Sequence, residues 1–262
     1  MAHTSAAQSE PSGSAPVIEV RMVTVAFGGL LALRGVDLDI MPGERLAVIG
    51  PNGAGKSTLF NVIAGDIAPT AGKVAVKGQD CTYRPSRHRP RLGVARTYQK
   101  ARTFDGLTVR DNIYLALAGH ARRHRALWRS SVDARMRSTA ANVAETVWLA
   151  GQLDHPAGQL AHGQKRQLEL GMAIATGPDV MLLDEPASGL SRGERERLIE
   201  VLESLAPEVT LLLIEHDMDV AFRIAQRVVV MADGETVTAG SPAQVQKDTN
   251  VHRIYLGTEA TA

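Results

Sequence analysis

Gly50-Pro51-Asn52-Gly53-Ala54-Gly55-Lys56-Ser57-Thr58 is the stretch on which the rest of the chain depends. It fits the pattern G-x-x-x-x-G-K-[ST] of a phosphate-binding loop. Its flanks also fit, because an apolar run at 45–49 precedes it and a helix is expected over 57–64. The alternative is a glycine-rich turn that binds nothing, and nine matching residues in this context leave it little weight.

Each residue type in the loop has its own chemical purpose. Gly50, Gly53 and Gly55 allow backbone conformations that point successive N–H groups at phosphate oxygens. Lys56 supplies a mobile cation for the β- and γ-phosphates, and the Ser57 hydroxyl is a candidate Mg²⁺ ligand. The candidate nucleotide-binding residues of the loop are Gly50, Pro51, Asn52, Gly53, Ala54, Gly55, Lys56, Ser57 and Thr58.

Length and composition describe a globular chain without an obvious polyanion partner. Its 262 residues are 44% hydrophobic, and 29 basic residues nearly balance 28 acidic ones. Cys81 is the only cysteine, which excludes an intrachain disulfide and a cysteine metal cage and favours a reducing compartment. No apolar run approaches the roughly 20 residues of a membrane-spanning helix. Residues 1–16 are rich in Ala, Ser, Pro and Gly, so we expect a disordered tail and not a secretory signal.

The basic residues are unevenly distributed. Residues 84–137 hold fourteen Lys and Arg residues against Asp105, Asp111 and Asp133. The run at 83–91 is interrupted by prolines, and a solvated surface segment is the favoured interpretation, with a surface for an acidic partner as the alternative.

Strand and helix patterns alternate along most of the chain, which predicts an α/β fold with a doubly wound, mostly parallel sheet. Strands are expected at 17–25, 36–40, 45–49, 72–78, 93–99, 180–184, 211–214 and 228–231. The first of these predict an antiparallel β subdomain. Helical periodicity begins at the capping residue Thr108 and returns at 130–150, which predicts a helical subdomain inserted at about 100–165. We expect further helices at 217–226 and, near the C-terminus, at about 242–257.

Two further features point to a ligand at the carboxyl edge of the sheet. The apolar run 180–183 leads directly into Asp184 and Glu185, as in a buried parallel strand whose end faces a ligand. Phe27, followed by Gly28 and Gly29, is placed in a loop between two strands. It could stack on a purine or be a core side chain, and the pattern alone does not decide between these.

Five motifs in one order give the chain a resemblance to a known family. The phosphate-binding loop, Gln99, Leu160-Ala161-His162-Gly163-Gln164, Asp184-Glu185 and Glu215-His216-Asp217 resemble the nucleotide-binding subunits of ATP-binding cassette (ABC) transporters, from about Val17 to the end. The details are most similar to the branched-chain (hydrophobic) amino-acid uptake family, including its urea and amide branch. They are Arg96-Thr97-Tyr98-Gln99, the helix beginning His162-Gly163-Gln164-Lys165, Glu215-His216-Asp217-Met218-Asp219 and Tyr255-Leu256-Gly257.

The resemblance implies a role for each motif. Asp184 would hold Mg²⁺ with Ser57 and Gln99, and Glu185 would be the general base for the attacking water. His216 would sense the γ-phosphate, which makes Glu185, His216, Gln99 and Lys56 the candidate catalytic residues. A second set of residues, Ala161, His162, Gly163 and Gln164, would present a helix N-terminus to ATP bound by a second protomer.

The chain departs from the family pattern at three positions. Ala161 replaces the signature serine and removes one hydroxyl from the partner's γ-phosphate. Ser191 stands where many relatives have aspartate, and Phe27 stands where tyrosine is common, which keeps the stacking surface and loses a hydroxyl.

The resemblance also implies a function and a set of partners. It predicts an ATP- and Mg²⁺-dependent ATPase that powers an importer of branched-chain or other hydrophobic amino acids, or of urea and amides. Expected partners are two membrane-spanning permeases, a second ABC ATPase subunit in a homo- or heterodimer and, indirectly, an extracytoplasmic substrate-binding protein. The expected location is peripheral, on the cytoplasmic face of the inner membrane, with Arg122, Arg123 and Arg125 towards permease loops or anionic lipid.

Two alternatives belong to other classes. A non-transport ABC ATPase acting on ribosomes or nucleic acid would explain the basic segment, but such proteins usually have two cassettes or a long coiled-coil arm. The interval from Lys56 to Gly163 is too short for that arm, so nucleic acid is not an expected partner. A P-loop kinase is the second alternative, and it would need neither the signature segment nor His216.

Overall fold

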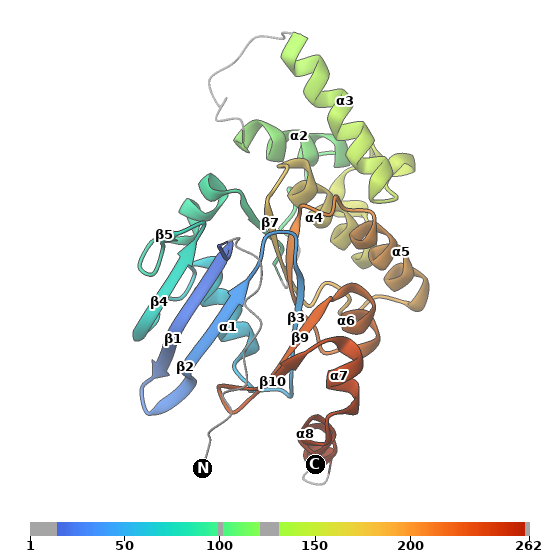
Figure 1. The fold of residues 1–262 in the computed structure, drawn as a ribbon. Helices are drawn as coiled ribbons and strands as arrows, with labels where there is room; N and C mark the ends of the chain where they lie inside the picture. Colours follow the sequence, from blue (N-terminus) through green and yellow to red (C-terminus); the bar gives the residue numbers. More distant parts are fainter. Residues whose placement is uncertain (1–14, 99–101, 121–130, 260–262) are drawn as a thin grey trace, which may run out of the picture.

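A computed structural model describes residues 15–98, 102–120 and 131–259 (Figure 1). The predicted disordered tail, except for Ala15 and Pro16, lies outside the described residues. So do Gln99 and the basic residues Arg122, Arg123, Arg125 and Arg129.

The central sheet has the order β10-β9-β3-β8-β7-β6 in the described part of the chain. Pairing is parallel from β9 to β6, and β10 joins the edge as the second strand of a hairpin. Its strands are β3 (Arg45–Ile49), β6 (Val94–Arg96), β7 (Val180–Asp184), β8 (Thr210–Ile214), β9 (Arg227–Ala232) and β10 (Glu235–Gly240). Every residue of β7 and β8 is buried, because a parallel sheet covered on both faces needs apolar side chains on both. The predicted doubly wound α/β fold is confirmed.

A second, antiparallel sheet has the order β2-β1-β4-β5. It contains β1 (Ile18–Phe27), β2 (Leu30–Ile40), β4 (Ala71–Val76) and β5 (Gln79–Asp80). The hairpin of β1 and β2 runs in register from Ile18 opposite Ile40 to Phe27 opposite Leu30. Both strands are longer than predicted, so Phe27 is the last residue of β1 and does not lie in the loop.

Helix α1 (Lys56–Ala64) packs between the two sheets, and this arrangement divides the core in two. Leu46 and Val48 of β3 join the core shared with α1 and the antiparallel sheet. Ala47 and Ile49 of the same strand face the second core, against the remaining helices. The alternation follows from the two-residue period of a strand, and it leaves the end of β3 fixed from both sides.

The other helices cover the opposite face of the central sheet or extend from it. Helices α2 (Val109–His120), α3 (Ser131–Thr146) and α4 (His162–Ala175) form a group at the top of Figure 1. The predicted cap at Thr108 is confirmed, since its Oγ1 accepts a hydrogen bond from the Asp111 N–H at 3.1 Å. The later helices are α5 (Arg192–Glu203), α6 (Met218–Ile224), α7 (Pro242–Lys247) and α8 (Thr249–Glu259), and short 3₁₀ segments are η1 (Ser86–Leu92), η2 (Ala150–Gln152) and η3 (Ala157–Gln159).

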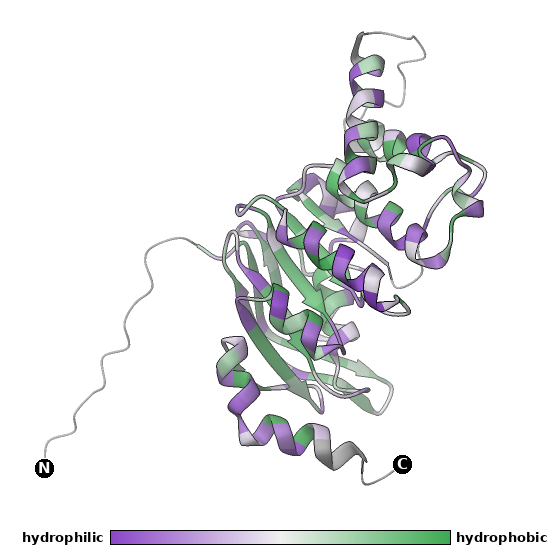
Figure 2. Ribbon diagram, turned by 90° about the vertical axis from the view of Figure 1, so that its right-hand side faces the viewer, coloured by the Kyte–Doolittle hydropathy of each residue, from purple (hydrophilic) through white to green (hydrophobic). Residues whose placement is uncertain are grey.

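Hydropathy follows this arrangement. Figure 2 shows apolar strands in the interior and polar residues along the outward faces of the helices. Among the described helices, none combines the length and the apolar character needed to cross a bilayer.

Two expectations about the basic run and the strand after it need correction. The prediction that residues 83–91 form a solvated surface segment is wrong for Arg89, which is buried in η1. Its Nε donates to the Ile63 carbonyl at 2.7 Å, and its Nη2 donates to the Cys81 carbonyl at 3.2 Å. The strand expected at 93–99 is only Val94–Arg96. Tyr98 leaves the sheet because its N–H donates to the Glu169 carboxylate on α4 at 2.7 Å.

Candidate functional site

The phosphate-binding loop connects β3 to α1, as the sequence predicts. Gly50, Gly53 and Gly55 have φ values of 150°, 81° and 94°, a backbone region that other residues rarely adopt. A Cβ on Gly55 would lie 2.6 Å from the Ala32 carbonyl oxygen. Glycine is therefore required at Gly55 by both conformation and space.

The Lys56 ammonium lies inside the loop. Its Nζ donates to the carbonyl oxygens of Gly50 at 2.7 Å and Pro51 at 2.8 Å. Burial lowers the pKa of Lys56, and the nearby Glu185 carboxylate partly opposes that shift. The cation is thus held in the concave loop by neutral carbonyl oxygens, which leaves its charge available to phosphate oxygens.

Asp184 is a buried carboxylate at the end of β7. Burial raises its pKa, and the neighbouring Glu185 carboxylate adds to the shift. Within the described ranges, no side chain or backbone group forms a hydrogen bond or ion pair with the Asp184 carboxylate. Such an oxygen donor, with the Ser57 hydroxyl at the start of α1, fits the hard-oxygen ligand set that Mg²⁺ prefers.

Glu185 and His216 follow two neighbouring strands. Asp184 pairs in register with Ile214 of β8, so the residues after both strands emerge at the same edge. His216 Nδ1 lies 4.0 Å from Glu185 Oε2 and 3.9 Å from Glu215 Oε2. Glu185 has a φ of 46°, and its N–H donates to the Ile214 carbonyl at 2.9 Å. The structure brings together a carboxylate and an imidazole that can accept, hold and donate protons next to a phosphate-binding loop.

The signature residues form the first turn of α4. Ala161 is the N-cap, and its N–H donates to Gln164 Oε1 at 3.0 Å. Ala161 and His162 are exposed, whereas Gly163 is buried beside the Glu194 carboxylate of α5. An exposed helix N-terminus can receive an anion from outside the chain.

The remaining predicted residues have different outcomes. Phe27 is 51% exposed, so its interpretation as a core side chain is wrong and its ring is free to stack on a planar ligand. Gln99 lies outside the described residues. Sequence reasoning missed the buried Glu215 carboxylate as a separate feature, although an acidic residue at the end of an apolar strand was a visible signal.

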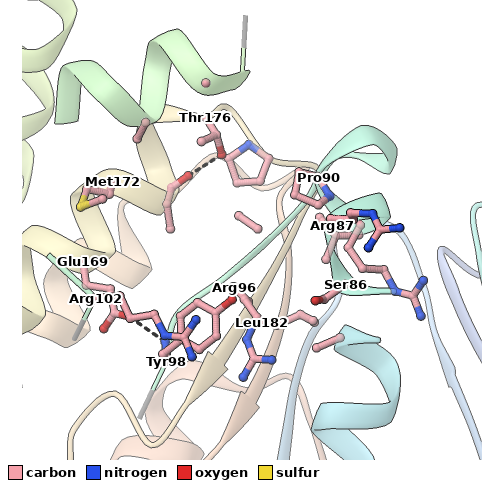
Figure 3. Close-up of a pocket in the computed structure, with 18 of the residues that line it drawn as sticks. Ser86, Arg87, Pro90, Arg96, Tyr98, Arg102, Glu169, Met172, Thr176 and Leu182 are labelled. Carbon is pink, nitrogen blue, oxygen red and sulfur yellow. Dashed lines mark hydrogen bonds between the residues drawn. The ribbon is translucent and has the colours of Figure 1, made fainter. Parts of the chain in front are cut away.

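A cavity of about 580 Å³ lies between η1, β6, α2 and α4 (Figure 3). Tyr98 is stacked between two guanidinium groups, with Arg96 at 4.3 Å and Arg102 at 3.9 Å from the ring centre. Leu115 and Met172 supply apolar lining from α2 and α4. The cavity is therefore part basic and part apolar, and it borders the segment that leads to Gln99.

Comparisons with known proteins agree with this geometry. The family model described as "ABC transporter" matches residues 33–188. The chain is 37% identical over 252 residues to the high-affinity branched-chain amino acid transport ATP-binding protein BraF of Pseudomonas aeruginosa, covering 93% of this chain and 99% of that one. It is also 37% identical over 255 residues to the corresponding protein LivG of Escherichia coli K12, with the same coverage.

Solved structures give the same result. The ADP conformation of MJ1267, an ATP-binding cassette of an ABC transporter, matches with a TM-score of 0.79 and 28% identity over 93% of this chain and 100% of that one. A dimeric post-hydrolysis structure of the cassette MJ0796 with ADP and phosphate matches with a TM-score of 0.74 and 25% identity over 86% of this chain and 98% of that one. The family match, the coverage of whole relatives and the nucleotide-site geometry lead to one conclusion: this chain belongs to the ATP-binding cassette family of ABC transporters and is an ATPase of that family.

Proposed function

We propose that this chain is the ATP-hydrolysing subunit of an importer for branched-chain or other hydrophobic amino acids, or for urea or amides. The observation that carries the proposal is the whole-length similarity to BraF and LivG, which are named as branched-chain amino acid transport proteins. An ABC ATPase acting on ribosomes or nucleic acid is not favoured, because these relatives cover 93% of the chain.

The residues at the carboxyl edge of the sheet have complementary roles in this proposal. The backbone of Gly50–Thr58 and the Lys56 ammonium bind the phosphates, and Phe27 stacks on the base. Ser57, Asp184 and Gln99 are the residues that would hold Mg²⁺, which neutralises charge on the phosphates. Glu185 accepts the proton of the attacking water, and His216, 4.0 Å from Glu185, contacts the γ-phosphate.

A second ATPase subunit completes each site. In this proposal the exposed start of α4, from Ala161 to Gln164, faces ATP bound by the partner. Ala161 contributes no hydroxyl, so backbone N–H groups and the helix end carry the contact. Losing one charge-assisted hydrogen bond corresponds to about 1 to 3 kcal/mol. We therefore expect slow hydrolysis in a homodimer, or a heterodimer whose other subunit has the serine.

The cavity between η1, β6, α2 and α4 is the proposed docking place for a permease segment. Its lining combines apolar side chains of Leu115 and Met172 with the exposed Arg102 guanidinium, which suits an amphipathic segment bearing a carboxylate. Glu169 on α4 holds the Tyr98 N–H at 2.7 Å, so a segment in the cavity contacts the approach to Gln99. Docking there places the chain peripherally on the cytoplasmic face of the membrane.

Uptake by cells tests the cargo. Cells lacking the gene are supplied with the wild-type chain or Lys56→Ala, and uptake of labelled leucine, phenylalanine and urea is measured. We expect the wild type to restore uptake of one of these substrate classes and Lys56→Ala to restore none. Equal uptake with both variants would contradict the proposal.

A further inference from the structure

Glu215 is a fully buried carboxylate directly after β8, and it joins two loops. Its Oε1 accepts a hydrogen bond from the Ala187 N–H at 2.9 Å. Its Oε2 accepts from the N–H groups of His216 at 3.1 Å and Asp217 at 3.3 Å. One oxygen therefore binds the loop after β7, and the other binds the loop after β8.

These two loops carry the candidate general base, Glu185, and the candidate sensor of the γ-phosphate, His216. Ala187 lies two residues after Glu185, and His216 is adjacent to Glu215 itself. A second contact fixes the loop after β8 to helix α5, because Arg195 in the first turn of α5 pairs with Asp217 at 2.5 Å. The positive φ of Glu185 is a conformation that costs free energy, and the Ala187 bond fixes the chain just after it.

We propose that Glu215 is a positioning residue for ATP hydrolysis, which sets the separation of Glu185 and His216 and makes their two loops move together. The inference rests on the ATPase activity of the family and is independent of the transported substrate.

The three hydrogen bonds to the Glu215 side chain explain why a carboxylate is needed at this position. Three N–H donors converge on two oxygens, and an ionised carboxylate can accept on both. Burial raises the pKa of Glu215, and the hydrogen bonds from Ala187, Asp217 and His216 oppose that shift. A glutamine has one acceptor oxygen, so its amide N–H₂ would face an N–H donor of one loop. Glu215→Gln therefore keeps the side-chain shape and releases one loop.

The matched control is Thr210→Val at the other end of β8. Thr210 is also buried, and its Oγ1 accepts from the Gly43 N–H at 2.9 Å, away from the catalytic edge. This substitution removes a buried hydrogen bond of the same strand without touching either loop. It therefore reports the effect of lost stability alone.

Amide hydrogen exchange and ATP hydrolysis of the purified chain test the proposal together. We expect Glu215→Gln to speed exchange in the peptide of whichever loop it releases, 185–191 or 216–219, and Thr210→Val to leave both peptides unchanged. We also expect kcat to fall about 10-fold with KM changed by less than about 2-fold, because a small misplacement of reacting groups acts on the chemical step. In a His216→Ala background, Glu215→Gln should change kcat by less than about 2-fold, since the separation of Glu185 and His216 that it sets no longer exists.

Three results would overturn the proposal. They are unchanged exchange in both loops, an unchanged kcat in the single variant, and a full 10-fold loss that persists in the His216→Ala background. The last would mean that Glu215 acts on stability or on another group. Exchange is measured without nucleotide, so a failure of the transport proposal would leave this test intact.

Discussion

At the scale of single residues, Lys56 and Asp184 carry opposite charges at one edge of the sheet, and both are buried. Among the described residues neither has an ion-pair partner within 4.0 Å. Burial lowers the pKa of Lys56 and raises that of Asp184, so the protein environment opposes the charged form of each group. Burying these two groups lowers the free energy of unfolding of the ligand-free chain, and binding of phosphates and a cation raises it again.

Replacing Asp184 with Asn should therefore stabilise the chain by about 1 kcal/mol at neutral pH in the absence of Mg²⁺ and nucleotide. A raised acid pKa means that the folded state binds the proton more tightly, so the wild-type free energy of unfolding falls as pH rises through the ordinary and then the raised pKa. The gain in Asp184→Asn should be small below the ordinary carboxyl pKa and should grow as pH rises through the raised pKa of Asp184. Urea unfolding at several pH values measures it, and a gain independent of pH would contradict the assignment to Asp184.

Lys56→Ala and Glu185→Gln should fail at different steps. Lys56→Ala removes the ammonium that lies inside the loop. It should weaken ATP binding about 100-fold, because the charge-assisted hydrogen bonds that the ammonium is proposed to make to phosphate would be lost. Glu185→Gln keeps the loop intact, so ATP should bind normally while hydrolysis falls by at least about 100-fold and an ATP-dependent dimer accumulates. Equilibrium binding, phosphate release and gel filtration separate the two. Normal turnover by Glu185→Gln would show that another group is the base.

Some residues of this site can be predicted from the sequence, whereas others become evident only in the structure. Gly50 to Ser57 are adjacent in the chain, so their geometry is encoded locally in the turn between β3 and α1. Asp184 and His216 could be placed because parallel strands end at one edge. The hydrogen bond from the Ala187 N–H to the Glu215 carboxylate could not be predicted. The two residues lie 28 positions apart, and only the tertiary structure brings them together.

At the scale of elements, local apolar runs predicted most strands, whereas long-range contacts decide where some of them end. Runs at 180–184 and 211–214 are buried on both faces, which makes the prediction robust. β6 ends early because Tyr98 bonds to Glu169, 71 positions away. Arg89 is buried for a similar reason, since carbonyl oxygens of Ile63 and Cys81 receive its guanidinium.

The turn from β3 into α1 should tolerate no side chain at Gly55. Gly55→Ala would combine a positive φ with a contact of 2.6 Å to the Ala32 carbonyl. We expect a loss of about 3 kcal/mol in the free energy of unfolding and loss of ATP binding. Gly193→Ala on α5 is the control, because a Cβ there meets nothing within 4 Å and should be neutral or stabilising. Thermal unfolding compares them, and equal melting temperatures would contradict this account of the turn.

At the scale of the whole molecule, the cavity beside β6 is the proposed docking place, between η1, β6, α2 and α4. Leu115, 40% exposed, lines it from α2, while Val237, 42% exposed, lies on the edge strand β10. Leu115→Glu should lower recovery with membranes by about 10-fold at unchanged ATP affinity, because it places a buried charge in the interface. Val237→Glu should leave recovery unchanged. Equal recovery of both variants in membrane flotation would show that the cavity is not the docking place.

Affinity capture from membranes tests whether this ATPase belongs to a membrane importer. A tagged Glu185→Gln chain is purified from gently solubilised membranes with ATP present, and the captured proteins are identified by mass spectrometry. We expect two multi-span membrane subunits and a second cassette ATPase subunit, either another copy of this chain or a different one. Capture of ribosomal or DNA-bound proteins without any multi-span subunit would contradict this expectation.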